Sequence, residues 1–248
     1  MTPGHTTSQN ALPVTVLGSG ERRALLVHGI NARAQSWWCI AESLAAAGWT
    51  TIAVDLPGHG RADATADCRL DALAALLPGR GWDLVIGHSL GATLALLAQA
   101  TDAGFARRLV LIEPVLELAP AEHKPVREQQ LAELDADAAA IAAAAPHWHP
   151  RDVAEKAAGA RAADPRTVAG IFDANRPWSF AGRVESLTVP TLVIGGDAGG
   201  SSMLPAVVAQ RLAGHPGVSL RRLEGAGHAP QRDRPEPTLA LIHDAASV

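Results

Sequence analysis

Short apolar runs, separated by longer amphipathic stretches, make up the hydrophobic pattern of this chain. The runs are rich in Val, Ile and Leu and are bounded by Gly, Pro and polar residues, which is typical of buried strands. They predict strands at residues 14–17, 24–27, 51–54, 84–86, 108–112, 191–194 and 218–223. Between them, apolar positions at helical spacing predict helices near residues 32–48, 70–77, 204–212 and 237–246, with a further helix directly after Gly91.

Strands that alternate with helices at this spacing indicate an α/β fold with a mostly parallel sheet and helices on both of its faces. The alternation stops over residues 115–180, which are rich in Ala and charged residues and contain no clear strand. We expect several helices there, interrupted at Pro146, Pro150, Pro165 and Pro177. Because the alternation then resumes, the sequence predicts a core of residues 1–114 and 181–248, with residues 115–180 as a helical insertion between strands.

Composition narrows the class of protein further. The chain has 248 residues, 48% hydrophobic and 19% charged, which is typical of a globular domain. Its net charge of −4 argues against nucleic acid or an anionic membrane as partner, and no apolar run approaches the roughly 20 residues that span a bilayer. Residues 1–13 lack a signal-peptide pattern, so the cytoplasm is the default expectation. Cys39 and Cys68 indicate neither a disulfide framework nor a metal site.

A candidate nucleophile lies between the strand at 84–86 and the helix that follows it. The segment Gly87-His88-Ser89-Leu90-Gly91 has the G-x-S-x-G pattern in the strand-to-helix context that a nucleophile elbow requires. Such a turn forces its apical residue into an unfavourable backbone conformation and favours glycine on both sides, where neighbouring backbone comes close. The hydroxyl of Ser89 would then lie at a helix N-terminus, where developing negative charge is stabilised.

Other polar side chains follow other predicted strands. Ligands of an open parallel sheet gather at the carboxyl ends of its strands. Ser89, Asp197 and His228 each follow a strand, in the order expected for a nucleophile, its acid and its base. Glu113 is the main rival to Asp197 as the acid, and Asp55 is a third carboxylate at a strand end.

Several short motifs, taken together, resemble the α/β-hydrolase fold superfamily over nearly the whole chain. They are His28-Gly29, Asp55-x-Pro57-Gly58-His59-Gly60, Gly87-x-Ser89-x-Gly91, Gly196-Asp197 and Gly225-x-Gly227-His228. Each motif is weak alone, but their order and spacing are specific to the fold. They are much less specific to a substrate.

The resemblance implies a role for each matching residue. Ser89 would be the nucleophile, His228 the general base and then acid, and Asp197 the carboxylate that orients His228. The backbone N–H groups of Ile30 and Leu90 would form the oxyanion hole. Residues 115–180 would correspond to the cap that such enzymes place over the site, where substrates are usually selected.

The resemblance leaves the acid open and gives other residues supporting roles. Some relatives carry the acid one strand earlier, where this chain has Glu113, which would otherwise line the site. His59 would brace the loop after Asp55, and His28 would hydrogen-bond backbone near the oxyanion loop. His88, beside the nucleophile, is usually a packing residue.

Candidate pocket residues come from two places. Trp37 and Trp38 follow the oxyanion loop and would either line an apolar pocket or pack in the core. His147 and Trp148, in the predicted cap, would line the pocket or lie at the surface. The spacing of His147 and His149 is poor for metal ligands, and we expect no metal.

Together these features predict a cofactor-independent serine hydrolase that cleaves a carboxylic ester, thioester or lactone of a small acyl substrate through an acyl-enzyme. A serine nucleophile argues against epoxide opening and dehalogenation, in which relatives use a carboxylate. Carbon–carbon bond hydrolysis and perhydrolysis use the same three residues and stay open as alternatives. A ligand receptor with slow turnover is the alternative from another class, and the oligomeric state is open.

Overall fold

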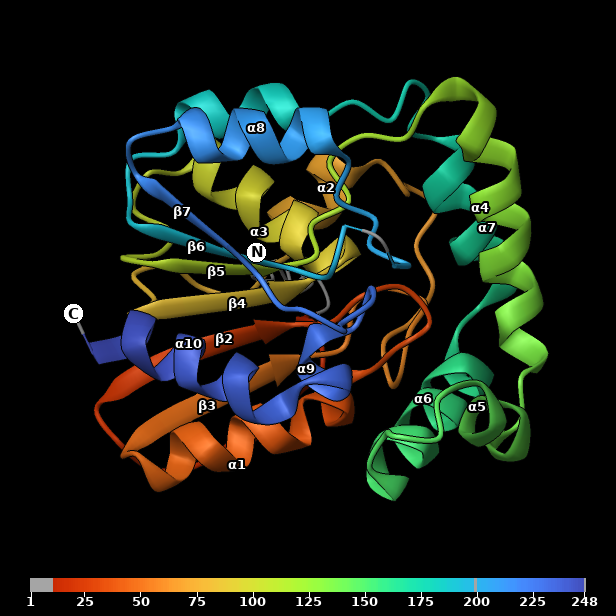
Figure 1. Cartoon of the computed structure of the whole chain (residues 1–248), viewed down its shortest axis with the longest axis horizontal. Helices are drawn as coiled ribbons and strands as arrows, with labels where there is room; N and C mark the ends of the chain where they lie inside the picture. The colour runs from red at the N-terminus through yellow and green to blue at the C-terminus, as the bar shows by residue number, and fades with distance from the viewer. Residues whose placement is uncertain (1–10, 199, 248) are drawn as a thin grey trace, which may run out of the picture.

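The computed structural model describes residues 11–198 and 200–247. Residues 1–10, on which much of the expectation about location rests, lie outside that range, as does Gly199. The fold is built on a seven-stranded sheet in the order β1-β3-β2-β4-β5-β6-β7 (Figure 1). The strands are β1 Val14–Leu17, β2 Arg22–Val27, β3 Trp49–Val54, β4 Leu84–His88, β5 Leu109–Ile112, β6 Thr191–Gly195 and β7 Val218–Arg222.

The sheet is parallel except at one edge, where β1 runs antiparallel to β3. The predicted strands are confirmed, with bounds that differ by a few residues at most. In the middle of the sheet, β2, β4 and β5 carry the apolar runs that the sequence indicated as buried. All parallel strands end at the same edge, so the residues that follow β4, β5 and β6 are brought close together.

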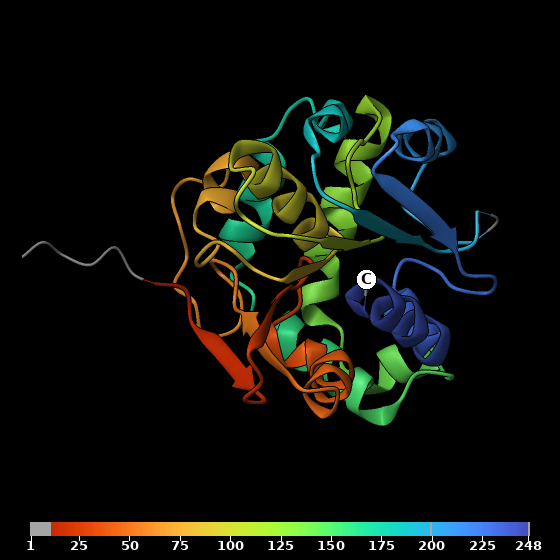
Figure 2. The same ribbon diagram turned by 90° about the vertical axis from the view of Figure 1, so that its left-hand side faces the viewer.

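Helices cover both faces of the sheet, as expected (Figures 1 and 2). On one face lie α1 Trp38–Ala46 and α10 Pro235–Ser247, and on the other lie α2 Leu70–Ala75, α3 Leu90–Thr101 and α8 Ala206–Gly214. The alternation of side chains along β4 explains this division. Leu84 and Ile86 belong to the apolar cluster under α1 and α10, whereas Val85 belongs to the cluster under α2, α3 and α8.

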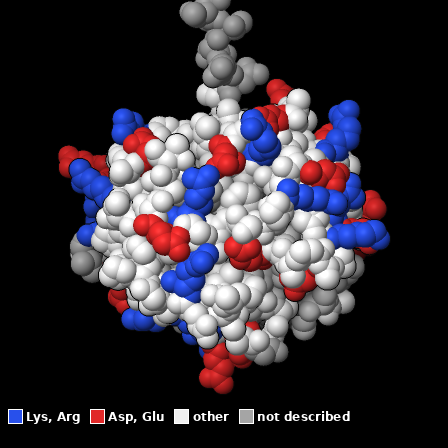
Figure 3. Space-filling model, turned by 90° about the horizontal axis from the view of Figure 1, so that it is seen from above, with Lys and Arg blue, Asp and Glu red and all other residues white. Residues whose placement is uncertain are grey.

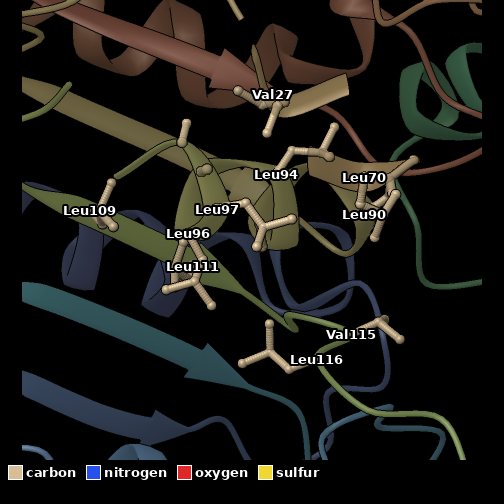
Figure 4. Packing of buried hydrophobic residues seen from close by; sticks show 14 of the residues in the cluster. Val27, Leu70, Leu90, Leu94, Leu96, Leu97, Leu109, Leu111, Val115 and Leu116 are labelled. Atoms are coloured by element: carbon tan, nitrogen blue, oxygen red, sulfur yellow. The ribbon is translucent and has the colours of Figure 1, made fainter. Parts of the chain in front are cut away.

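The larger of the two apolar clusters anchors the helix that follows the candidate nucleophile. Figure 4 shows Leu94 and Leu97 of α3 together with Leu70 of α2 and Leu109 and Leu111 of β5. Each of these side chains is almost fully buried. Full burial of a leucine stabilises a fold by about 1.5–3 kcal/mol, so the start of α3 is held rigidly against the sheet.

Residues 115–180 are mainly helical, as the sequence predicts. They contain α4 Pro120–Ala132, α5 Ala138–Ala144, α6 Pro150–Ala162 and α7 Pro165–Asp173, which we call the α4–α7 segment. The segment lies beyond the carboxyl ends of the strands (Figure 1). Pro150 and Pro165 each stand at the first position of a helix, where the missing N–H has no intrahelical acceptor in any case. Pro125 lies inside α4.

The predicted helix at 32–48 differs in detail from the structure. It begins as a 3-10 helix, Ala34–Trp37, and becomes α-helical only from Trp38 to Ala46. The buried carboxylate of Asp55 accepts a hydrogen bond from the Ala34 N–H at 2.8 Å and so fixes where the chain leaves the preceding loop. Gly48 follows the helix with a positive φ of 81°, the conformation typical of a helix-ending glycine.

Acidic and basic side chains are interspersed on the face seen in Figure 3. Ion pairs connect separate elements of the chain, such as Arg183 with Asp71 at 3.4 Å and Arg211 with Glu185 at 3.5 Å. Within the part of the chain that the structure describes, no helix combines the length and apolar character needed to cross a membrane.

Candidate active site

Ser89 lies in the sharp turn between β4 and α3. Its φ of 54° and ψ of −117° place it in an unfavourable region for a residue with a side chain. A Cβ on Gly87 would lie 2.6 Å from the Ala92 nitrogen, and one on Gly91 would collide with the carbonyl of Val27. The two glycines therefore allow the close approach that the sequence motif predicts, and the turn has the backbone geometry expected of a nucleophile elbow.

His228 follows β7 and contacts Ser89 directly. Its Nε2 lies 2.9 Å from Ser89 Oγ, and its Nδ1 lies 3.1 Å from Oε2 of Glu113. With the Nδ1 proton donated to the carboxylate, Nε2 is free to accept the hydroxyl proton of Ser89. The three side chains form a continuous hydrogen-bond chain from a carboxylate to a hydroxyl.

Glu113 is buried at the end of β5 with four donors around its carboxylate. Besides His228, the N–H of Gly196 donates at 2.6 Å, the Ser202 hydroxyl at 2.7 Å and the N–H of Met203 at 2.7 Å. Burial alone would raise the pKa of Glu113, but the hydrogen bond and charge of His228, with the other donors, outweigh it and hold the pKa below its ordinary value. The carboxyl group is therefore ionised at neutral pH.

The acid expected from the sequence was Asp197, and here the geometry differs from that expectation. The carboxylate within hydrogen-bonding distance of His228 is the one of Glu113, the rival. Asp197 follows β6, and its backbone N–H donates to the carbonyl of Ala226 at 2.7 Å. The reason lies in the local backbone. Glu113 has a positive φ of 47°, and the first residue after β6, Gly196, supplies a donor to its carboxylate.

The two backbone N–H groups expected to form an oxyanion hole belong to residues beside Ser89. Leu90 is the first residue of α3, where backbone N–H groups have no intrahelical acceptor. Ile30 lies in the loop after β2, and both residues line the cavity described below. The loop passes very close to Ser89, since a Cβ on Gly29 would lie 3.1 Å from the Cβ of Ser89.

Asn31 joins that loop to the α4–α7 segment. It is fully buried, has a positive φ of 55°, and donates from Nδ2 to the carbonyl of Gln130 in α4 at 2.7 Å. On α6, Gly159 packs so closely that a Cβ would lie 2.9 Å from the Cα of Ala32. The loop that carries Ile30 is therefore held by contacts from the core and from α4 and α6.

Two buried histidines brace the loops around the site, as expected. His28 donates from Nδ1 to the Gly29 carbonyl at 2.7 Å and accepts at Nε2 from the Leu56 N–H at 3.0 Å. Burial, and then the charge of His59, lower the pKa of His28 to about 3. His59 donates from Nδ1 to the Pro57 carbonyl at 2.9 Å, and burial lowers its pKa too. Both rings are neutral hydrogen-bonding groups at physiological pH.

His88 has a more specific role than the packing expected of it. Its Nε2–H donates to the backbone carbonyl of His228 at 2.7 Å, which connects the end of β4 to the loop that carries His228. Burial, and then the charge of His228, hold the pKa of His88 well below its ordinary value. A neutral His88 keeps a second positive charge away from the Ser89–His228 pair.

Asp55, the third carboxylate at a strand end, supports a loop. It is fully buried, and besides the bond from Ala34 it accepts one from Arg61 Nε at 2.8 Å. A side chain on Gly60, which has a positive φ of 56°, would collide with this carboxylate. These contacts account for the carboxylate without any part in the Ser89–His228 chain.

A cavity of about 660 Å³ lies between Ser89 and the α4–α7 segment. Its apolar walls come from the core and from that segment. They include Leu90, Val115 and Met203 on one side and Val126, Ile141 and Phe172 on the other. The side chain of His228, 31% exposed, also lines the cavity. The space is large enough for a small acyl substrate and is predominantly apolar.

Five residues were predicted to line a pocket: Trp37, Trp38, Glu113, His147 and Trp148. Glu113 contacts His228 instead, and two of the other four reach the cavity. His147 and Trp148 line it, and both donate to Oδ1 of Asp233, at 3.0 Å and 2.6 Å. Trp37 instead packs in the apolar cluster under α1, and Trp38 donates to Asp152 of α6 at 2.9 Å. Adjacent residues at the start of a helix point in different directions, so one tryptophan enters the core and the other contacts α6.

Sequence reasoning missed the charged residues that line the cavity. Glu133 and Lys156 belong to residues 115–180, whereas Arg232 and Asp233 lie in the short helix α9 Pro230–Asp233. Oδ2 of Asp233 accepts the N–H of Gly227 at 2.8 Å, beside His228, while Oδ1 accepts the two donors from the α4–α7 segment. The sequence signal for Arg232 and Asp233 was weak, because it consisted of their position a few residues after His228. Their partners lie some 85 residues away, at 147–148.

Comparison with known proteins agrees with this architecture. Residues 24–241 match the model of the alpha/beta hydrolase family. The E-2-(acetamidomethylene)succinate hydrolase structure superposes with a TM-score of 0.81 at 22% identity, covering 96% of this chain and 95% of the other. A thermophilic esterase from Thermogutta terrifontis gives a TM-score of 0.75 at 21% identity, with 94% and 92% covered. The chain belongs to the alpha/beta hydrolase family.

Relatives with described activities support the same class. The chain is 29% identical to esterase Rv0045c of Mycobacterium tuberculosis over 91% of its own length and 83% of that protein. It is 35% identical to lipase LipV of the same organism, in a match that spans 47% of this chain and 46% of LipV. The protein is a hydrolase.

Proposed function

We propose that the protein is a serine esterase that cleaves a carboxylic ester, thioester or lactone through an acyl-enzyme intermediate. The observation that carries this proposal is the hydrogen-bond chain from Glu113 through His228 to Ser89 at the cavity. The similarity to an esterase and a lipase supports the reaction class.

In the first step His228 removes the hydroxyl proton of Ser89 while Oγ attacks the substrate carbonyl carbon. The ionised carboxylate of Glu113, in place of Asp197, keeps the Nδ1 proton on the far side of the ring and stabilises the imidazolium that forms. The collapsing tetrahedral intermediate takes a proton from His228 and releases the alcohol. Water, activated by the same imidazole, then releases the acid and restores Ser89.

The oxyanion of the tetrahedral intermediate would accept the N–H groups of Ile30 and Leu90. Their place beside Ser89, one in the loop after β2 and one at the start of α3, supports this role. Each such donor is typically worth about 2.7–4 kcal/mol of transition-state stabilisation. The positive end of α3 favours the same negative charge.

Residues 115–180 act as a cap in this proposal. Side chains of the α4–α7 segment form a large part of the cavity wall, including Val126, Ile141, Trp148 and Phe172. A substrate would therefore contact the core at its reacting carbonyl and the α4–α7 segment along its remaining length. Substrate selection would come from these contacts.

The first test is a burst assay with p-nitrophenyl esters of short and medium acyl chains. The wild-type protein is expected to release p-nitrophenolate in a burst followed by turnover, because acylation precedes hydrolysis of the acyl-enzyme. Ser89→Ala is expected to lower the rate by at least about a thousandfold. The matched control is Ser186→Ala, because Ser186 is an exposed serine between α7 and β6. This substitution is expected to leave the rate unchanged.

An adduct measurement separates the possible failures. Intact-protein mass spectrometry of the quenched reaction is expected to show an acyl group on the wild type that is absent from Ser89→Ala. Turnover that survives in Ser89→Ala would exclude Ser89 as the nucleophile. Folded wild-type protein with no turnover of any ester in the series would exclude the esterase proposal.

A further inference from the structure

The guanidinium group of Arg232 is buried at the cavity and has almost no hydrogen-bond partners in the protein. Arg232 lines the cavity and is only 7% exposed. Its Nε has no hydrogen-bond partner, and among the described residues no hydrogen bond to its terminal nitrogens is present. The nearest acid is Asp152, whose Oδ1 lies 4.0 Å from Nε, and the guanidinium carbon lies 4.9 Å from the ring of Trp148.

Such an arrangement is unusual, because a buried charge is ordinarily paired and hydrogen-bonded. Burial lowers the pKa of Arg232, while the charges of Asp152 and then Asp233 raise it. Arginine keeps its charge in proteins even under such conditions. The cavity therefore contains a cation whose planar set of donors is not used by the protein.

The acids around Arg232 are already engaged by other donors. Asp233 accepts from His147, Trp148 and the N–H of Gly227. Asp152 accepts from the indole of Trp38 at 2.9 Å.

The acid farther along the same cavity wall is also paired. Glu133 accepts from Lys156 at 2.8 Å and from Gln129 at 3.2 Å. The negative charges of the nearby acids thus lower the free-energy cost of burying the guanidinium, but they do not accept hydrogen bonds from its N–H groups.

From this geometry we infer that the ester carries a carboxylate group, which binds the free donors of Arg232. The inference rests on the proposed esterase function and names its substrate class, an ester that is also a carboxylic acid. A guanidinium and a carboxylate match as two parallel N–H···O bonds, which fix orientation as well as charge.

A singly charged carboxylate suits this site better than a phosphate. Asp152, Asp233 and Glu133 all lie near the cavity wall, and a doubly charged group would meet more repulsion from them than a singly charged one. The remaining wall is apolar, so the ester is expected to carry a hydrocarbon chain between its carbonyl group and its carboxylate.

Two matched pairs of esters test the inference. Monomethyl adipate against methyl hexanoate places the carboxylate on the acyl chain, and 5-acetoxypentanoate against pentyl acetate places it on the alcohol. In at least one pair the wild-type kcat/KM is expected to favour the carboxylate. In Arg232→Gln that preference is expected to fall about tenfold or more, mainly through a higher KM. Arg232→Lys keeps the positive charge and is expected to retain part of the preference for the carboxylate ester.

Controls exclude a purely structural role for Arg232. Arg166→Gln removes the same charge from an exposed position on α7 and is expected to leave the preference unchanged. Thermal unfolding of each variant shows whether the fold is retained. A direct readout uses Ser89→Ala with and without Arg232→Gln, titrated by calorimetry with both members of the ester pair for which the wild type prefers the carboxylate. The carboxylate ester is expected to bind more weakly when Arg232 is replaced, and the neutral ester to bind equally well.

The outcomes distinguish this inference from the proposed function. Two results would overturn the role of Arg232 and leave the esterase proposal standing. One is that the wild type hydrolyses the neutral esters as well as their carboxylate partners. The other is that Arg232→Gln lowers kcat/KM equally for both members of a pair. Failure to hydrolyse any ester would overturn the esterase proposal. Binding of the carboxylate ester that is unaffected by Arg232→Gln would overturn the carboxylate site on its own.

Discussion

At the scale of single residues, Glu113 is a buried carboxylate that His228 contacts, at 3.1 Å. Four donors surround Glu113, and its carboxyl group is fully buried. The sequence indicated Ser89 and His228 correctly as neighbours, because a glycine-flanked serine and a histidine after the last strand each have a local signature. The acid has none, since any carboxylate after β5 or β6 lies at the same sheet edge.

A matched pair of amides tests this assignment. Glu113→Gln is expected to lower kcat by about a thousandfold or more, because the neutral amide neither orients the imidazole nor stabilises its charged form. Asp197→Asn is expected to retain activity within about threefold of the wild type, since changes away from reacting groups have small effects. Initial rates with one p-nitrophenyl ester measure both. A larger loss in Asp197→Asn than in Glu113→Gln would return the role to Asp197.

At the scale of helices and loops, Asp233 connects the α4–α7 segment to the loop that carries His228. One carboxylate oxygen binds His147 and Trp148 of the segment, and the other binds the backbone of Gly227. Local hydrophobic patterns predicted the helices on both sides of this contact. They contained no information on how the loop between α5 and α6 contacts α9, so neither Asp233 nor Arg232 could be assigned from the sequence.

Replacement of Asp233 is therefore expected to loosen that contact. In Asp233→Asn the amide oxygen can still accept the hydrogen bond from the indole of Trp148. The amide nitrogen, however, is a donor and then faces the N–H of Gly227, which is also a donor, so that hydrogen bond is lost. Loss of a buried hydrogen bond costs about 1–3 kcal/mol. We expect faster amide hydrogen exchange in residues 138–150 and a kcat/KM lower by about tenfold.

Asp173→Asn is the matched control, because Asp173 forms only exposed ion pairs, with Arg127 at 2.9 Å and Arg176 at 3.3 Å. Such pairs contribute about 0–1 kcal/mol, so exchange and activity are expected to stay near the wild-type values. Equal exchange rates at 138–150 in Asp233→Asn and Asp173→Asn would contradict the connecting role of Asp233.

At the scale of the whole molecule, buried neutral histidines make stability depend on pH. His28 has a pKa of about 3 in the folded chain, against 6.5 for an unperturbed histidine. Below pH 6.5 the unfolded state binds a proton that the folded state does not, so stability is full above pH 6.5 and is lost as the pH falls toward 3. His59 and His88 act in the same direction.

Urea unfolding at several pH values measures this effect. The free energy of unfolding is expected to fall by about 1.4 kcal/mol per pH unit for His28 alone between pH 6 and pH 4. His28→Asn, which retains a donor for the Gly29 carbonyl, is expected to lose that part of the slope whatever its stability at pH 7. His243→Asn, on α10, is the control. Parallel slopes for wild type and His28→Asn would refute the contribution.

The overall architecture was the part most open to prediction. Apolar runs such as 84–86 and 109–112 are buried on both faces and form strands with little dependence on distant residues. Trp37 and Trp38 show the opposite case. Their apolar character was evident, but which one enters the core and which one contacts α6 depends on a 3-10 turn and on Asp152, far along the chain.

The hydrogen bond from Asn31 to Gln130 has a consequence for modularity. Insertions in a fold are often regarded as exchangeable parts that can be grafted between scaffolds. Here a transplanted α4–α7 segment would also remove Gln130 and Gly159, which hold the loop around Ile30 and Ala32. A chimera would thus gain new pocket walls but also a displaced Ile30. To avoid this displacement, the loop around Ile30 and Ala32 would have to be exchanged together with the α4–α7 segment.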